Sequence, residues 1–270
     1  MLVFDAVIYN EDRHFGNFGV LRDNRTGKII SPAPIFDNGL SLINYAMNND
    51  IKDLDSYCPP VFGIEDGKLY MFLNQMASAD HMHSLDLYIY DEGINNFERP
   101  WSRPIPFKLN TNIYEMSNGK LIMPGRIAEL DGFSQIPAVM ISDRGKINSE
   151  WQIVKITDKK ELPDNSEFIH PEVFLILNDN KIYAFCRNDQ RKVPIIFLSY
   201  DFGESWHVPY VSDVPFPNSK IYSGTLSSGR NYAIGNVDPN REKTVLFLSV
   251  PAARFCLIAA MSCNTDFPMN

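Results

Sequence analysis

Two arginines occupy the same position in successive repeats of the sequence, and together they could bind a carboxylate. Turn residues at positions 67, 119, 180 and 229 each open a short apolar segment. Seven residues after each turn comes a large polar residue, in the order Asn74, Arg126, Arg187 and Asn236. A guanidinium group binds a carboxylate through two parallel hydrogen bonds, so paired arginines favour an acidic ligand. Glu172 precedes Arg187 by 15 residues and is expected one strand earlier in the same repeat.

The elements that position these residues repeat with a regular period. The four turn residues lie 52, 61 and 49 residues apart. A second turn follows in phase, with Asp91, Asp143 and Asp201 each placed two residues before a glycine. A fourth copy near residue 251 retains Ser249 and Phe255 but lacks the Asp and the Gly. Several strands in a period of about 50 residues predict four antiparallel blades of a β-propeller in an open arc.

The composition and charge of the chain disfavour several classes of protein. The chain has 270 residues, of which 44% are hydrophobic, and 25 basic against 33 acidic residues give a net charge of −8. This balance disfavours nucleic acid as a partner. Apolar runs are shorter than the roughly 18 residues of a membrane helix, and no signal peptide precedes the first strand, so a cytoplasmic protein without a membrane partner is expected. The four cysteines form no C-x-x-C pair, which argues against zinc and redox motifs.

The chain changes character near Pro59-Pro60, since consecutive prolines continue neither a helix nor a central strand. We expect a small α+β fragment over residues 1–57, propeller blades over 58–255 and an irregular tail over 256–270.

The segment from Ser199 to Trp206 has the pattern S-x-D-x-G-x-x-W. It resembles the Asp-box of the sialidase (BNR-repeat) superfamily, in which the aspartate holds a turn. The resemblance implies a mainly β, sialidase-like propeller that is incomplete, with about four of six blades visible.

The resemblance also implies roles for individual residues. Glu172 looks like the partner of a tyrosine nucleophile, and Arg187 and Arg241 look like the second and third arginines of a triad that grips a sugar carboxylate. Arg126, followed by Ile127, is similar to the first. Asp131 is the candidate acid/base, and Asn236 belongs to the ring of repeated polar residues. The family's tyrosine follows its third arginine, whereas the candidate nucleophile here, Tyr222, precedes Arg241.

These assignments predict a glycosidase that acts on a sialoside or another acidic glycan and needs no cofactor. Because the arginine triad and the tyrosine depart from the family pattern, hydrolysis is expected to be slow or absent while binding persists. A non-catalytic sugar-binding propeller is the alternative.

The first 57 residues carry a different motif. Asp12 is followed by Asn17 and, later, by Asp37 in an Asp-Asn-Gly sequence. An Asp that activates a hydroxyl, with an Asn and an Asp that hold magnesium, is the arrangement of phosphoryl transfer. The stretch resembles the C-terminal lobe of HipA-like serine/threonine kinases, which use ATP and Mg²⁺. The nucleotide-binding half has no counterpart here, so we expect an inactive kinase remnant. Its junction with the propeller indicates a gene fusion, a pseudogene or a sequence-assembly join.

Overall fold

The computed structural model describes residues 20–22, 29–32, 56–57, 60–76, 82–94, 96–128, 135–159, 162, 167–188, 190, 193–207, 209–211, 220–236, 243–250 and 254–262. Contacts divide the chain into two units, Met1–Pro59 and Pro60–Asn270. The described part of the first unit comprises an antiparallel hairpin of β1 (Val20–Arg22) and β2 (Ile29–Pro32), followed by β3 (Ser56–Tyr57). The kinase-like residues Asp12, Asn17 and Asp37 lie outside the described residues. None of the residues that the structure describes forms a helix able to cross a membrane.

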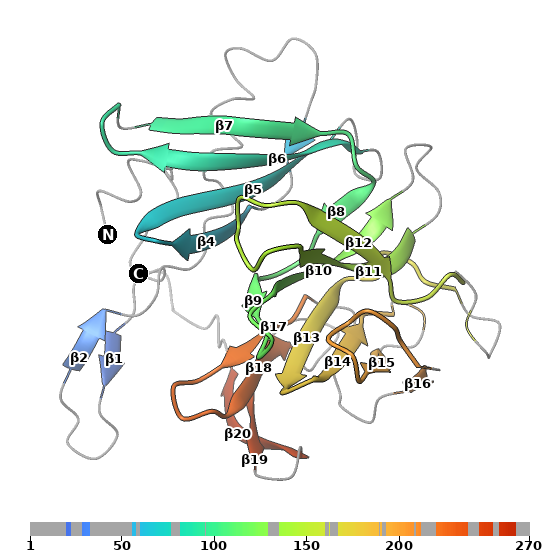
Figure 1. The fold of residues 1–270 in the computed structure, drawn as a ribbon. Coiled ribbons are helices and arrows are strands. Elements are labelled where there is room, and N and C mark those ends of the chain that lie inside the picture. Colours follow the sequence, from blue (N-terminus) through green and yellow to red (C-terminus); the bar gives the residue numbers. More distant parts are fainter. Residues whose placement is uncertain are drawn as a thin grey trace, which may run out of the picture. The chain divides into compact units, whose positions relative to one another are not determined.

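The second unit consists of antiparallel sheets that follow one another along the chain (Figure 1). The first sheet contains β4 (Val61–Glu65), β5 (Lys68–Met76), β6 (Met82–Asp91) and β7 (Asn96–Arg103). In the second sheet, β8 (Phe107–Leu109) and β9 (Tyr114–Glu115) both pair with β10 (Leu121–Ala128), which is followed by β11 (Gln135–Ser142) and β12 (Trp151–Lys155).

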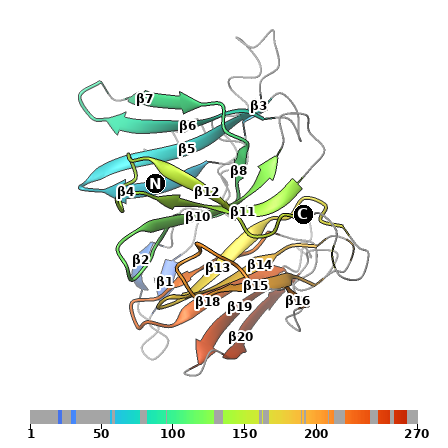
Figure 2. The same ribbon diagram turned by 45° about the vertical axis from the view of Figure 1, so that its right-hand side comes forward.

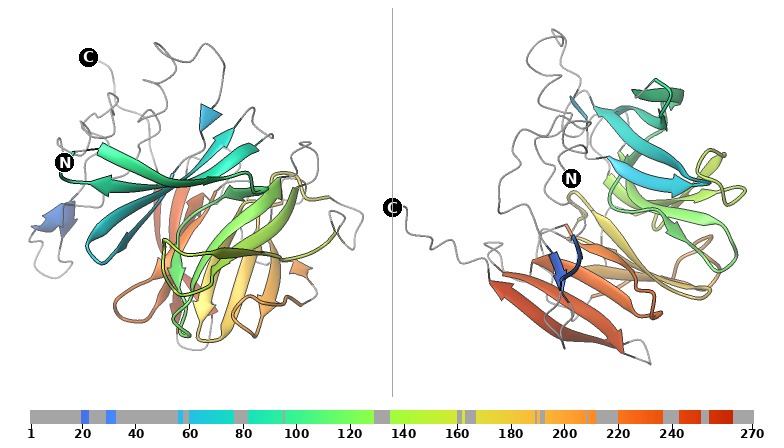
Figure 3. Two further views of the ribbon diagram at one scale, coloured as in Figure 1. Left: turned by 45° about the horizontal axis from the view of Figure 1, so that its top comes forward. Right: turned by 90° about the vertical axis from the view of Figure 1, so that its left-hand side faces the viewer.

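The third and fourth sheets repeat the same meander. The third contains β13 (Val173–Asn178), β14 (Lys181–Cys186), β15 (Ile195–Ser199) and β16 (Tyr210–Val211), and the fourth contains β17 (Tyr222–Thr225), β18 (Asn231–Asn236), β19 (Lys243–Val250) and β20 (Arg254–Ser262). The sheets lie one after another in chain order, from the teal strands to the red ones (Figure 2), and two further views show the same order (Figure 3). The predicted all-β propeller blades are therefore confirmed, with β5, β10, β14 and β18 following the four turns.

The end of the fourth sheet differs from the expectation of an irregular tail from residue 256. Residues 254–262 form β20, which pairs with β19 from Arg254 opposite Val250 to Ser262 opposite Lys243. Pairing with β19 satisfies the backbone groups of this segment even though the sequence between the strands lacks the Asp and the Gly of the other copies. The residues after Ser262 lie outside the described residues.

The core lies between the sheets rather than within any one of them. One apolar cluster joins the first and second sheets, a second joins the second and third, and a third joins the third and fourth. In β13, Val173 and Leu175 belong to one cluster, whereas Phe174 and Ile176 belong to the next. Because such a strand is buried on both faces, its sequence is a continuous apolar run instead of an alternating one.

Buried side chains join the inner strands of different sheets by hydrogen bonds. The amide of Asn74, which is fully buried, donates from Nδ2 to the carbonyl of Phe107 at 2.8 Å and accepts at Oδ1 from the N–H of Leu109 at 2.8 Å. The hydroxyl of Tyr114 lies 2.8 Å from that of Ser223, which donates to the carbonyl of Leu175 at 2.7 Å. The repeated polar position at Asn74 therefore fixes one sheet to the next.

The Asp-box forms the turn after β15. The hydroxyl of Ser199 donates to Oδ1 of Asp201 at 2.8 Å and accepts from the N–H of Gly203 at 2.8 Å. The same Oδ1 accepts from the N–H of Ser205 at 2.9 Å. Gly203 has a φ of +87°, a left-handed value that favours glycine. Trp206 packs against the cluster between the second and third sheets, so the motif is structural.

Candidate functional site

Glu172 and Arg187 face each other across the first two strands of the third sheet. The N–H of Glu172 donates to the carbonyl of His170 at 2.7 Å, which makes a tight turn about Pro171 just before β13. The N–H of Arg187 donates to the carbonyl of Glu172 at 2.8 Å, so the antiparallel ladder continues past the ends of β13 and β14. Nη1 of Arg187 lies 2.6 Å from Oε2 of Glu172, and the side chains are 18% and 22% exposed. The pair of residues predicted to lie together forms a partly exposed ion pair.

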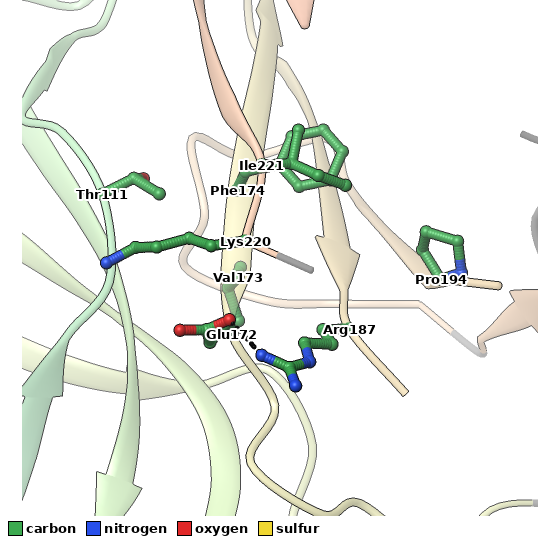
Figure 4. Close-up of a pocket in the computed structure, with 8 residues that line it drawn as sticks. All are labelled: Thr111, Glu172, Val173, Phe174, Arg187, Pro194, Lys220 and Ile221. Atoms are coloured by element: carbon green, nitrogen blue, oxygen red, sulfur yellow. Dashed lines mark hydrogen bonds and ion pairs between the residues drawn. The ribbon is translucent and has the colours of Figure 1, made fainter. Parts of the chain in front are cut away.

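This ion pair lines a small pocket (Figure 4). Thr111 comes from the loop between β8 and β9, while Lys220 and Ile221 immediately precede β17. Three successive sheets therefore contribute to one pocket, whose full lining is Thr111, Glu172, Val173, Phe174, Arg187, Pro194, Lys220 and Ile221. In an antiparallel meander the start of the first strand and the end of the second strand lie at the same end of the sheet. This explains why Glu172 and Arg187 lie together in the pocket.

Tyr222 lies beside this pocket at the start of β17. Its side chain is partly exposed, and its ring centroid lies 5.9 Å from Nζ of Lys220. Partial burial raises the pKa of Tyr222, and the negative charge of Glu172 raises this pKa further. The phenol is therefore protonated at neutral pH, and it lies near enough to Glu172 for the negative charge of that carboxylate to act on it.

Arg126 occupies a different environment from Arg187. It is 5% exposed and lies in β10, four residues after Ile122 and hence on the same face of the strand. Ile122 packs in the cluster between the second and third sheets. The lining of the pocket includes Arg187 but not Arg126. A carboxylate shared by the two arginines therefore stays a prediction.

Of the remaining candidate residues from the sequence analysis, the structure describes Asn236 but not Asp131 or Arg241. Asn236 is the last residue of β18 and pairs with Thr244. Asp131 and Arg241 lie outside the described residues. Within the part of the chain that the structure describes, no three His, Cys, Asp or Glu side chains gather as metal ligands.

The sequence analysis missed Lys220 and Thr111. Neither residue lies at the polar position seven residues after a turn, because Thr111 is in the loop between β8 and β9 and Lys220 is in the segment just before β17. The available signal was Lys220-Ile221-Tyr222 at the beginning of the fourth repeat, the place that corresponds to Pro171-Glu172-Val173 in the third.

Comparison with known proteins settles the family. Residues 59–262 match the sequence pattern described as a BNR repeat-like domain. The chain belongs to this family. A search among curated proteins gives no match.

Solved structures with the same fold as this BNR repeat-like protein include several that act on sugars. The sialidase of Trypanosoma rangeli in complex with sialic acid is 14% identical with a TM-score of 0.53, over 80% of this chain and 40% of the sialidase. The Hadza microbial sialidase Hz136 is 10% identical with a TM-score of 0.56, over 89% of this chain and 52% of that one. The α-L-arabinanase of Penicillium chrysogenum complexed with arabinobiose is 14% identical with a TM-score of 0.52, over 75% of this chain and 66% of the arabinanase. At these identities the likeness concerns the fold, and the match spans less than two thirds of each of these three chains.

Proposed function

We propose that the pocket binds an acidic glycan and that the protein is a glycoside hydrolase of the sialidase-like kind. The observation that carries the proposal is the Glu172–Arg187 ion pair, at 2.6 Å, in a pocket built from three blades with Tyr222 at its side. The complexes of structural neighbours with sialic acid and with arabinobiose support a carbohydrate as the ligand.

The pocket offers the groups that sugar binding requires. The guanidinium of Arg187 presents donors in a fixed fork, which suits carboxylate and hydroxyl oxygens. Phe174, Pro194 and Ile221 provide apolar surface in the same lining. A concave site with apolar walls and a few oriented polar groups is typical of small-molecule recognition.

Tyr222 and Glu172 supply a nucleophile and a base for hydrolysis. The phenol oxygen of Tyr222 would attack the anomeric carbon while the Glu172 carboxylate takes the phenol proton and the bond to the leaving oxygen breaks. Asp131, by resemblance, would protonate that oxygen, and water would then release the sugar from the tyrosine. A neutral nucleophile suits a sugar whose anomeric carbon bears a carboxylate, because an attacking carboxylate would be repelled by it.

The direct experiment measures hydrolysis of a fluorogenic α-sialoside, and binding of the corresponding free sugar, by the wild-type protein and by Glu172→Gln. Loss of turnover in Glu172→Gln, with turnover retained in the control Glu204→Gln on an exposed turn, would support the proposal. Turnover that survives Glu172→Gln would contradict it.

A non-catalytic sugar-binding propeller is the second candidate. The ion pair favours it, because Arg187 can hold an acidic sugar whether or not Tyr222 reacts. Binding of acidic sugars without turnover by the wild-type protein would select this function. Absence of both binding and turnover would reject the two candidates together.

A further inference from the structure

The proposed base and the proposed nucleophile stand at the entrances to two different sheets. Glu172 directly precedes β13 of the third sheet, and Tyr222 begins β17 of the fourth. Backbone hydrogen bonds fix the spacing of strands within a sheet, whereas two packed sheets have no such ladder between them. The placement of Glu172 relative to Tyr222 therefore depends on contacts that cross between sheets. Residues 110–114 of the second sheet, called here the bridging segment, make such contacts with both places; they form the loop between β8 and β9 and the first residue of β9.

Asn110 ties the bridging segment to the third sheet. Its Oδ1 accepts from the N–H of Val173 at 2.8 Å, so the main chain directly after Glu172 is held by a side chain of the second sheet. Asn110 is itself anchored, because its N–H donates to the carbonyl of Pro124 at 3.1 Å and its Nδ2 donates to the carbonyl of Leu109 at 3.1 Å. The position of the proposed base is thus set from the neighbouring sheet.

Tyr114 ties the same segment to the fourth sheet. Its hydroxyl lies 2.8 Å from that of Ser223, whose own proton goes to the carbonyl of Leu175 at 2.7 Å, so Tyr114 is the donor. Nδ2 of Asn112 donates to the carbonyl of Ser223 at 3.1 Å. Since Ser223 directly follows Tyr222, the main chain beside the proposed nucleophile is held as well.

These hydrogen bonds lie in a buried place, where water competes little with them. Asn110, Tyr114 and Ser223 are all buried. Burial raises the pKa of Tyr114, so its phenol keeps the proton that it donates. We propose that Asn110 and Tyr114 are positioning residues that set the placement of Glu172 relative to Tyr222. This inference rests on the proposed function, because it concerns the base and the nucleophile of that reaction.

A loss of positioning should lower turnover more than sugar binding. Displacement of reacting groups by about 1 Å costs roughly a hundredfold in rate. Binding depends instead on Arg187, which is held by Glu172 within the third sheet itself. The expected signature of the bridging segment is therefore a lower kcat with little change in affinity.

The first test measures kcat on a fluorogenic α-sialoside and Kd for sialic acid. Tyr114→Phe removes one oxygen and keeps the ring, and Asn110→Ala removes the acceptor of the Val173 N–H. We expect kcat to fall about tenfold to a hundredfold in each, with the Kd little changed. Asn110→Asp keeps an acceptor oxygen at the same place, so it should recover part of the lost kcat.

The matched control is Asn231→Ala. Nδ2 of Asn231 donates to the carbonyl of Leu177 at 3.0 Å, so it also joins the third and fourth sheets, but at the opposite end of β13 from Glu172. Asn231 is not part of the pocket lining. We expect Asn231→Ala to lower the free energy of unfolding and to leave kcat unchanged.

The second test needs no turnover. The negative charge of Glu172 raises the pKa of Tyr222, so Glu172→Gln should lower this pKa. The pKa of Tyr222 is measured by NMR on protein with tyrosine labelled at Cζ, and Tyr222→Phe identifies its signal. If Tyr114 sets the spacing, the decrease caused by Glu172→Gln should be smaller in the Tyr114→Phe protein than in the wild type.

The inference is overturned if Tyr114→Phe and Asn110→Ala keep the kcat of the wild type, or if Asn231→Ala loses as much kcat as they do. The latter result would be a general effect of loosening the sheets. A wild-type protein without turnover would reject the proposed hydrolysis and leave the decision to the pKa comparison. A decrease of equal size with and without the Tyr114 hydroxyl would then overturn the inference, so the two failures are distinguishable.

Discussion

Arg187 and Glu172 are joined twice, by a backbone hydrogen bond of 2.8 Å and by a side-chain ion pair of 2.6 Å. The backbone hydrogen bond fixes the main-chain positions of the two residues, and the ion pair fixes the positions of their charged groups. The guanidinium therefore reaches the pocket already oriented, which lowers the entropic cost of binding a ligand.

Substitution of Arg187 by Ala should weaken the binding of an acidic sugar. Because the ion pair is partly exposed, we expect a loss near the lower end of the range for broken charge pairs, about 2 kcal/mol or roughly thirtyfold in Kd. Arg187→Lys should recover only part of the affinity, since an ammonium lacks the fork of donors. Calorimetry with sialic acid checks this, with Arg144→Ala, on an exposed turn, as the control. Equal affinity in wild type and Arg187→Ala would remove Arg187 from the site.

Asn74 should be important for stability although it lies at the repeated position that suggested a binding ring. Replacement by Ala leaves the N–H of Leu109 and the carbonyl of Phe107 without their hydrogen bonds in a buried place. We expect a loss of about 2–4 kcal/mol in the free energy of unfolding, since unsatisfied buried polar groups are costly. Urea denaturation measures the loss, and Asn178→Ala, at an exposed strand end, is the control. A loss no larger than that of the control would contradict the structural role.

The contrast between Asn74 and Arg187 shows how much of the fold and of the candidate site could be predicted from the sequence. The phased turns predicted the strands and their order, because turn residues and apolar runs are local properties of the chain. The same repeat could not distinguish a residue that fastens two blades from one that lines a pocket. That distinction depends on which neighbouring strand faces the side chain, as the burial of Arg126 between two sheets also shows. Lys220 was missed because the pocket that it lines is completed by residues from two other sheets.

The Asp-box should make the stability of the protein depend on pH in the acid range. Partial burial alone would raise the pKa of Asp201, but the hydrogen bonds from Ser205 and Ser199 together lower it. A lowered pKa in the folded state stabilises the protein above the unfolded value of about 3.9, and this stabilisation is lost as the pH falls through the folded pKa.

Asp201→Asn should therefore lose less stability than the wild-type protein between about pH 5 and the acid limit, while being less stable at neutral pH. Denaturation in urea at a series of pH values gives this comparison. Asp143→Asn is the matched control, because Asp143 holds the corresponding place in the second sheet but its side chain is 66% exposed. If Asp201→Asn and wild type lose stability in parallel as the pH falls, Asp201 does not titrate with folding.

Tyr222 should separate catalysis from binding. Tyr222→Phe keeps the ring beside Lys220 and removes the oxygen that would attack the anomeric carbon, so we expect the Kd for an acidic sugar to change little. If Tyr222 is the nucleophile, kcat on a fluorogenic sialoside should fall by about a hundredfold or more, as for the loss of a group that acts in the transition state. Tyr210→Phe is the control, since Tyr210 and Tyr222 are both 48% exposed and Tyr210 lies in β16, outside the pocket lining. Turnover at the wild-type rate in Tyr222→Phe would leave the tyrosine as a binding residue only. A parallel loss in both variants would point to a general effect on the fold.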